Sequence, residues 1–167
     1  MVLDRAWSMT SIGSMLAAAL LVGCGFHLQG AGPLPHSIAL VRIDTNDTES
    51  DFYFGLRKAL LAAGTRIDSD GHDDSATVIH VLNDSTARRI LTVSALNVPT
   101  EYELSYSLKF SVTAHGRDLI EPESHTLVRD YNFSENQMLA KQREDRILSE
   151  ALAHDLVSVV MRRLASL

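Results

Sequence analysis

The amino-acid sequence predicts an α+β fold, in which two helices cover one face of a four-stranded sheet. The expected order along the chain is β-α-β-β-β-α, which gives a two-layer sandwich with a mixed or antiparallel sheet. Three observations indicate this class. Apolar and polar residues alternate over 101–115, apolar residues have helical spacing over 51–63, and an apolar stripe runs along the C-terminal segment.

The first two elements are a strand and a helix. Residues 37–45 are rich in aliphatic side chains, which is typical of a strand. Apolar residues then recur every three or four positions over 51–63, which is the spacing of one helix face. Ser50 or Asp51 can cap the start of this helix, and Gly64 suits its C-terminal end.

Three further strands are predicted after a polar loop at 68–75. Residues 76–83 form the second strand, and 88–93 are expected to continue it beyond a bulge. The alternation over 101–115 predicts a long antiparallel strand with one face in the core and one polar face. A glycine-containing turn then leads to the fourth strand at 123–133.

The chain is predicted to end in a long helix. Ser134 and Gln137 have the spacing of a capping box. Apolar residues then recur at helical intervals over 148–164, which gives the helix a face for the core. Together these elements fit a single α/β domain over 37–167.

The N-terminal region is predicted to be a signal peptide that ends at a lipid attachment site. Residues 12–22 are uncharged and as a helix would reach about 16 Å, too short to span a bilayer but typical of a signal peptide. The sequence Leu-Val-Gly-Cys ending at Cys24 resembles the processing box of bacterial lipoproteins. We therefore expect removal of 1–23, a lipidated tether over 24–36, and an N-acyl and S-diacylglycerol lipid on Cys24. The alternative is a core helix with an ordinary buried cysteine.

The residue after the cysteine bears on location. Gly25 follows Cys24, where an aspartate is associated with retention in the inner membrane. We therefore expect a lipid-anchored protein of the outer membrane. With its one cysteine lipidated, the domain has no disulfide, and no cofactor other than this lipid is predicted.

Composition and spacing argue against several kinds of site. The net charge of −6 argues against general nucleic-acid binding, which needs an excess of Lys and Arg. The acidic segment 68–74 departs from the calcium-loop template, because its glycine comes at the fourth position and Ile79 stands at the twelfth. The histidines lack metal-binding spacing, and His80 is expected to be a structural residue within a strand. No metal site is predicted.

The chain is not predicted to be an enzyme, because no nucleophile motif or phosphate-binding loop occurs. Two groups of basic residues are candidates for contact with an anionic glycolipid headgroup. Arg88 and Arg89 adjoin the second strand. Lys141, Arg143 and Arg146 begin the last helix. The alternative is a solvated surface on which these cations pair with Glu144, Asp145 and Glu150.

Short motifs spread over almost the whole mature chain point to one family. They are Cys24-Gly25-Phe26-His27-Leu28, Glu101-Tyr102 in the long strand, Gly116-Arg117-Asp118 at the hairpin, and Asn136-Gln137-Met138-Leu139-Ala140-Lys141 before the final helix. Together with the order of elements, these motifs resemble the LptE family of lipopolysaccharide-assembly lipoproteins. The cysteine-glycine-aromatic-histidine-leucine start is the most specific of them.

The resemblance implies a non-enzymatic role. LptE-like proteins plug the lumen of the LptD β-barrel, help it to assemble, and take part in delivering lipopolysaccharide to the outer leaflet. By position, Cys24 corresponds to the lipid anchor and Lys141 to a basic residue that contacts lipopolysaccharide. A second basic residue of the family falls at 95–97, where this chain has none, and Arg88 or Arg89 is the candidate to replace it. The domain would lie in the barrel lumen or on the periplasmic side.

A different function class fits the same features. A lipid-anchored periplasmic binding module or chaperone, with an anionic lipid or a protein as its client, would share the leader and the two-layer fold. A lipoprotein hydrolase is a third class, which converging Ser, His and Asp side chains in a deep pocket would favour.

Overall fold

The computed structural model describes the backbone of residues 34–132 and 138–167, and the side chains of 34–132 and 143–167. The signal peptide, Cys24 and the Ser134 cap therefore lie outside the described residues, and the predicted domain bounds remain predictions. The elements are η1 (His36–Ile38), β1 (Leu40–Asp44), α2 (Asp51–Ala62), β2 (Arg66–Ile67), β3 (Thr77–Val93), β4 (Pro99–Ala114), β5 (Arg117–Asn132) and α3 (Met138–Ala165).

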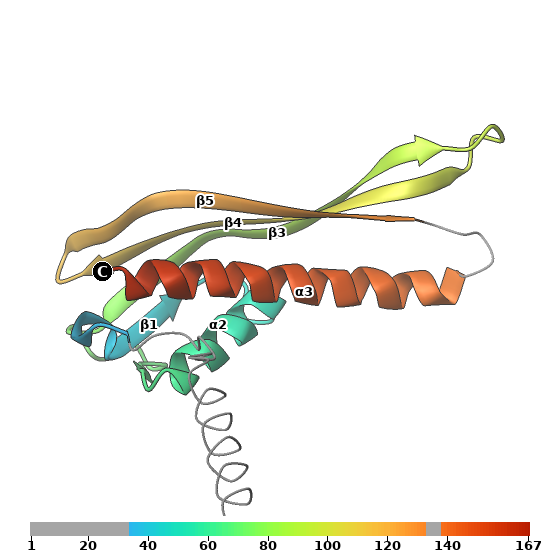
Figure 1. The fold of residues 1–167 in the computed structure, drawn as a ribbon. Coiled ribbons are helices and arrows are strands. Elements are labelled where there is room, and N and C mark those ends of the chain that lie inside the picture. The colour runs from blue at the N-terminus through green and yellow to red at the C-terminus, as the bar shows by residue number, and fades with distance from the viewer. Residues whose placement is uncertain (1–33, 133–137) are drawn as a thin grey trace, which may run out of the picture. The chain divides into compact units, whose positions relative to one another are not determined.

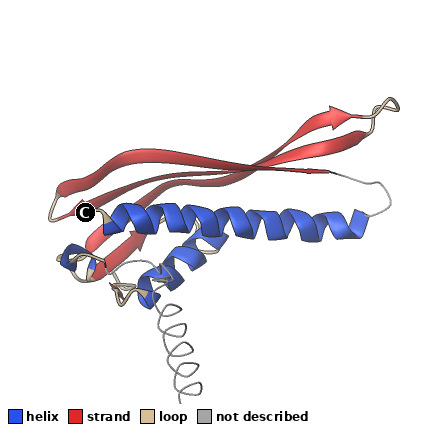
Figure 2. Cartoon of the chain, viewed as in Figure 1, coloured by secondary structure: helices blue, strands red, loops and turns tan. Residues whose placement is uncertain are grey.

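The predicted α+β class is confirmed, with two helices on one face of a mixed sheet (Figures 1 and 2). The strand count of four was wrong, because the described sheet has five strands in the order β2-β1-β3-β4-β5. The additional strand, β2, has two residues and pairs in parallel with β1. So short a strand has no alternation to detect in the sequence. Its position is fixed by backbone hydrogen bonds from Arg66 N to Ala39 O and from Asp68 N to Val41 O.

The long strands follow the predicted pattern. β3 is continuous over Thr77–Val93, which confirms that 88–93 continue the second strand. Its register with β4 shifts between Val81 and Asn83, however, within the predicted strand at 76–83 and not after it. In β4 the apolar residues face the helices and are buried, while the residues between them line the open face. β3, β4 and β5 form an antiparallel three-stranded ribbon that extends beyond the rest of the sheet (Figure 1).

The helices pack closely on one end of this ribbon. Ser50 caps α2, because its Oγ accepts from Tyr53 N at 3.1 Å. A Cβ at Gly55 would lie 3.1 Å from Val157 Cγ2, so glycine permits the close approach of α2 to α3. The fully buried core beneath them includes Ile38, Val41, Phe52, Leu56, Leu60, Ile79, Phe110, Leu152, Leu156 and Leu164. We call this end, where α2, the second half of α3, β1 and β2 lie, the proximal half.

At the other end of the ribbon β4 keeps a buried row of apolar residues, but β3 and the first half of α3 are much less buried. From Leu82 to the end of β3 only Asp84 is partly buried, and in α3 the described residues before Leu152 are exposed or half-buried. We call this end, formed by β3 from Leu82, the paired parts of β4 and β5 and the first half of α3, the distal half. Neither described helix is long and apolar enough to cross a membrane.

Candidate functional site

Arg88 and Arg89 lie on opposite faces of β3, because consecutive strand residues point in opposite directions. Arg88 pairs in register with Leu104 of the buried row, so it faces α3. Arg89 pairs with Glu103 and faces away from the helices. The structure therefore does not bring the two arginines together into one basic patch.

Arg88 holds the sheet to the first half of α3. Its Nη1 donates to Asp145 Oδ2 at 2.8 Å, and its guanidinium lies 5.2 Å from the centre of the Tyr102 ring. Tyr102 in turn stacks on Tyr131, with ring centres 5.7 Å apart. These residues adjoin a shallow cavity of about 510 Å³ lined by Thr86, Ala87, Arg88, Leu104, Asp145, Arg146 and Ser149. A charged pair and an aromatic stack thus join β3, β4, β5 and α3 in the distal half.

The side chains of this cluster change one another's proton affinities. Burial and the neighbouring Asp145 carboxylate together raise the pKa of Tyr131 to about 12, although Arg88 opposes the shift. Burial opposes the charge of Arg88, but the Tyr131 hydroxyl and Asp145 outweigh it and raise the pKa of the guanidinium. Tyr131 therefore stays neutral and Arg88 stays charged at any physiological pH.

Arg89 is also paired, on the open face. Its Nε lies 2.7 Å from Glu103 Oε1 and its Nη2 lies 2.8 Å from Glu103 Oε2, which is the two-pronged arrangement of a strong arginine–carboxylate pair. Hydrogen bonding to Glu103 raises the pKa of Arg89. An anionic ligand at either arginine would have to displace or share a carboxylate partner.

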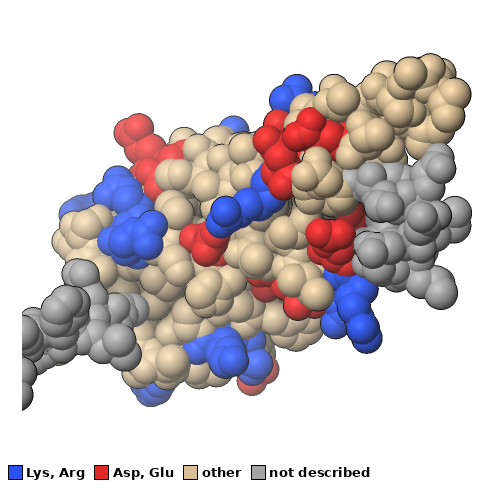
Figure 3. Space-filling model, turned by 45° about the vertical axis from the view of Figure 1, so that its right-hand side comes forward, with Lys and Arg blue, Asp and Glu red and all other residues tan. Residues whose placement is uncertain are grey.

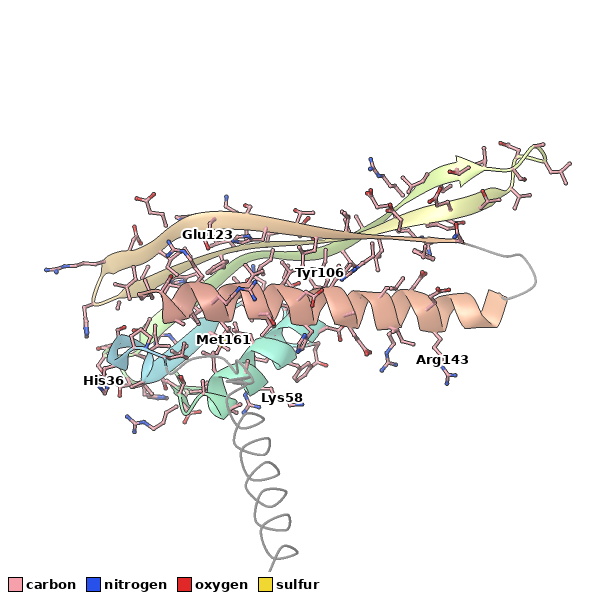
Figure 4. The ribbon with its side chains drawn as sticks, viewed as in Figure 1. His36, Lys58, Tyr106, Glu123, Arg143 and Met161 are labelled. Carbon is pink, nitrogen blue, oxygen red and sulfur yellow. The ribbon has the colours of Figure 1, made fainter. Side chains whose placement is uncertain are left out.

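The predicted basic cluster of the last helix is only partly described. Lys141 lies in the first turn of α3, and its side chain is outside the described residues. Arg143 is exposed and points away from the sheet (Figure 4). Arg146 donates to Glu150 at 2.7 Å, one helical turn along. The ion pairs of Arg88 with Asp145 and of Arg146 with Glu150 match the alternative of a solvated surface with ion pairs. Contact of Arg88, Arg89 and Lys141 with lipopolysaccharide remains a prediction.

Sequence reasoning missed the tip of the β3–β4 hairpin. Residues 90–100 carry no charged side chain, and Leu96 is 87% exposed. Ile90, Leu91 and Val93 are also exposed, so the surface at this end is apolar and uncharged (Figure 3). The signal was present as an uncharged run that contains five large aliphatic residues, but it resembled ordinary strand sequence.

Three hydrogen bonds within the tip close its turn. Ser94 N donates to Val98 O at 2.7 Å, Asn97 N donates to Ser94 O at 2.9 Å, and Val98 N donates to Ser94 Oγ at 3.2 Å. Asn97 adopts a φ of 60°, a conformation that asparagine tolerates better than most residues. A turn closed in this way loses few hydrogen bonds with water when a partner or a lipid covers it.

The open face of the ribbon is flat and rich in hydroxyl groups. Ser107 Oγ lies 3.0 Å from Thr126 Oγ1, and Ser105 Oγ donates to Ala87 O. Ser85 lies in the same row as Ser107 and Thr126, and Asn83 and Ser124 flank Lys109 in the next row. This face can make many hydrogen bonds but has few apolar side chains.

His80 is a partnered residue, as expected from its place in a strand. Its Nδ1 lies 2.9 Å from Asp44 Oδ2, and its Nε2 lies 3.0 Å from Thr113 Oγ1. The connectivity is that of a hydroxyl–histidine–carboxylate triad. It lies on the open sheet face, however, where the neighbouring N–H groups belong to the ladder and do not form an oxyanion site. The arrangement joins β1, β3 and β4.

The acidic loop uses its carboxylates to hold its own backbone. Asp68 Oδ1 accepts from Gly71 N at 3.1 Å, and Asp73 Oδ1 accepts from the backbone N and the hydroxyl of Ser75. Hydrogen bonds from Ser75 lower the pKa of Asp73. Among the described side chains, no group of three or more His, Cys, Asp or Glu is placed to hold a metal ion.

Comparisons with known proteins show what this arrangement resembles. The chain is 25% identical over 152 residues to the LPS-assembly lipoprotein LptE of Pectobacterium atrosepticum, covering 91% of this chain and 82% of that one. It is 22% identical to the protein of that name from Yersinia enterocolitica, covering 89% of this chain and 72% of that one.

Solved structures share the fold. Lipoprotein B from Nitrosomonas europaea has a TM-score of 0.68 at 23% identity, covering 85% of this chain and 91% of that one. A minor lipoprotein from Acinetobacter baumannii has a TM-score of 0.66 at 20% identity, covering 80% and 94%. The family model described as LptE, lipopolysaccharide-assembly, matches residues 36–164. The chain belongs to the LptE family of lipopolysaccharide-assembly lipoproteins.

Proposed function

We propose that this protein is a lipid-anchored subunit of the outer membrane that plugs an LptD-like β-barrel, helps it to assemble, and takes part in delivering lipopolysaccharide to the outer leaflet. The observation that carries the proposal is the family match over 36–164, on a domain with a long polar ribbon face. The role is non-enzymatic, and the lipid on Cys24 is its only covalent group.

The chemistry of the open face supports the plug role. Barrel interiors are polar and hydrated, so a partner inside one meets hydrogen-bonding groups rather than an apolar wall. The Ser and Thr rows of β3, β4 and β5 offer such groups, and the ladder around them holds their spacing. A polar surface of this kind can form many direct or water-mediated hydrogen bonds.

Contact with lipopolysaccharide is assigned to the distal half. The candidate residues are Arg88, Arg89 and Lys141, whose cations can bind phosphate groups. To do so, Arg88 would replace its contact with Asp145, and Arg89 its contact with Glu103, by a contact with phosphate. Residues 95–97 lie in the uncharged hairpin tip, where the family has a basic residue. This chain would therefore rely on arginines at the base of the tip and on apolar contact at its end.

Co-purification tests the central part of the proposal. Full-length protein extracted from membranes in mild detergent is expected to carry a large β-barrel protein in a fixed ratio. A monodisperse lipoprotein without a barrel partner would contradict the plug role. If that lipoprotein bound lipopolysaccharide alone, the result would favour the lipid-anchored binding module instead.

A second experiment tests the anchor separately. The variant Cys24→Ser is expected to accumulate as an unprocessed precursor or as a form released into the periplasm, because the thiol that accepts diacylglycerol is missing. Normal processing and normal membrane retention of this variant would refute lipidation at Cys24. Fractionation and mass measurement of the N-terminal peptide report both outcomes.

A further inference from the structure

The outer face of α2 carries an unusual combination of residues. Phe54, Arg57, Lys58 and Leu61 are three and four positions apart, so they form one stripe along the helix. Phe54 is 53% exposed and Leu61 is 49% exposed, although the opposite stripe of α2 is fully buried. The helix is therefore apolar on two sides, only one of which packs on the domain.

The two cations of this stripe have no carboxylate partner among the described side chains. Arg57 and Lys58 are exposed and form no ion pair there, as is also true of Arg66, Lys109, Arg117, Arg143 and Arg162, but only these two lie next to each other between exposed large apolar side chains on one helix face. Lys58 points away from the sheet and from α3 (Figure 4). Unpaired cations between exposed apolar side chains are typical of a helix face that lies on an anionic lipid surface.

The predicted tether places that surface within reach. Residues 25–33 separate Cys24 from Leu34, and a fully extended chain of that length spans about 30 Å. Leu34 packs against the core and leads through η1 into β1, which pairs with β2, the strand that directly follows α2. The described chain thus begins next to the β1–β2 edge of the sheet, and a link of this length to a lipid anchor raises the local concentration of lipid headgroups around the domain.

We propose that the α2 stripe docks the domain on the anionic phospholipid surface that carries its own lipid anchor. The inference rests on the proposed lipidation of Cys24, but not on the barrel. Apolar contact by Phe54 and Leu61 and attraction of Arg57 and Lys58 to phosphates act together, so docking requires anionic lipid and does not occur on a neutral bilayer.

A thiol probe can report docking in the full-length lipoprotein. Cys24 is the chain's only cysteine, so once it is lipidated the exposed position in Ala62→Cys provides the only free thiol for an environment-sensitive fluorophore. The protein is reconstituted in vesicles of phosphatidylcholine, or of phosphatidylcholine with an equal amount of phosphatidylglycerol. We expect a blue shift at Ala62→Cys only with phosphatidylglycerol, and no shift at Ser85→Cys on the open sheet face.

Charge variants make the test specific. Arg57→Gln/Lys58→Gln is expected to lower the ratio of docked to undocked protein about 30-fold, or about fivefold per cation. Arg117→Gln/Arg162→Gln removes the same charge from exposed positions elsewhere and is expected to leave the ratio unchanged.

Three outcomes would overturn the inference. They are an equal shift in both vesicle types, an equal loss in both double variants, or a shift that appears only when a barrel protein is added. The last would assign the stripe to a protein partner. Since co-purification of a barrel is measured separately, failure here with an intact barrel complex would overturn only the lipid-docking inference.

Discussion

The proximal and distal halves of the domain are stabilised by different interactions. In the proximal half, α2, α3 and the sheet enclose fully buried side chains such as Phe52, Phe110 and Leu156. In the distal half, β4 still carries a buried row of Tyr102, Leu104, Tyr106 and Leu108, but the described residues of β3 and of the first half of α3 are exposed or half-buried. Sheet and helix are joined there by the partly exposed Arg88–Asp145 pair beside the buried Tyr102–Tyr131 stack. Burial of a large apolar side chain contributes several times more free energy than an exposed ion pair. The distal half should therefore open more easily while the proximal half stays folded.

Ion pairs join α3 to the sheet in both halves. Arg129 of β5 pairs with Asp155 at 3.2 Å, and Glu123 pairs with Arg163 at 3.3 Å, where the apolar core already holds the helix. At Asp145 the pair with Arg88 joins β3 to a part of α3 whose described residues are exposed or half-buried. The difference between the halves lies in what surrounds such pairs.

The largest loss of stability is expected from a substitution in the core of the proximal half. Phe52→Ala removes a fully buried ring and should lower the free energy of unfolding by about 3–5 kcal/mol, because the cavity cannot close completely. Phe54→Ala, on the same helix but 53% exposed, is the matched control and should change it by less than about 1 kcal/mol. Urea unfolding of both variants checks the difference, and similar losses would contradict the assigned faces of α2.

The next largest loss of stability is expected at the contact between α2 and α3. Gly55→Leu places a side chain where even a Cβ would lie 3.1 Å from Val157 Cγ2, so overpacking should cost about 1–3 kcal/mol. The double variant Gly55→Leu/Val157→Ala should recover part of the loss, because it removes the opposing methyl groups. A thermal shift assay can follow both. An additive double variant would show that the two residues do not meet.

A smaller effect is expected from the distal pair. Arg88→Gln removes the bond to Asp145, yet it should cost less than about 1 kcal/mol globally, since the arginine side chain is 45% exposed. Amide exchange in the first half of α3 should become faster while exchange over 152–164 stays unchanged. Arg162→Gln, at an exposed position of the proximal half, is the control. Faster exchange throughout α3 would contradict separate behaviour of the halves.

The smallest effect at neutral pH is expected at Tyr131. Its pKa rises from 10.0 to about 12 in the folded protein, so the folded state keeps a proton that the unfolded state loses. The resulting stability is complete below pH 10.0 and is lost as the pH rises through about 12. In Tyr131→Phe the free energy of unfolding should therefore fall less steeply with pH between 10.0 and about 12. Urea unfolding of both proteins over this pH range measures the slope, and an equal slope in the variant and the wild type would show that Tyr131 does not contribute to the loss of stability at alkaline pH.

Local patterns were enough to predict the long elements of the fold. The alternation in β4 and the four-residue spacing in α2 reflect burial of a single face, so the sequence records them directly. β2 escaped detection because two residues have no period, and it is fixed by backbone bonds to β1.

The candidate site was less predictable than the fold. Strand alternation alone places Arg88 and Arg89 on opposite faces. Their partners required the tertiary structure, because Asp145 lies 57 positions from Arg88 along the chain. The uncharged tip could have been identified from composition, whereas its closed hydrogen bonding at Ser94 could not.

Hydrogen exchange of the full-length protein, alone and in the co-purified barrel complex, tests the account most directly. Amides of the proximal core, in α2 and over 152–164 of α3, should be strongly protected in both states. Amides of β3 and β4 in the distal half should exchange faster in the free protein and become protected in the complex, because the proposed barrel and lipopolysaccharide contacts lie there. Equal protection of the two halves in the free protein, or no change in the distal half on complex formation, would contradict the account.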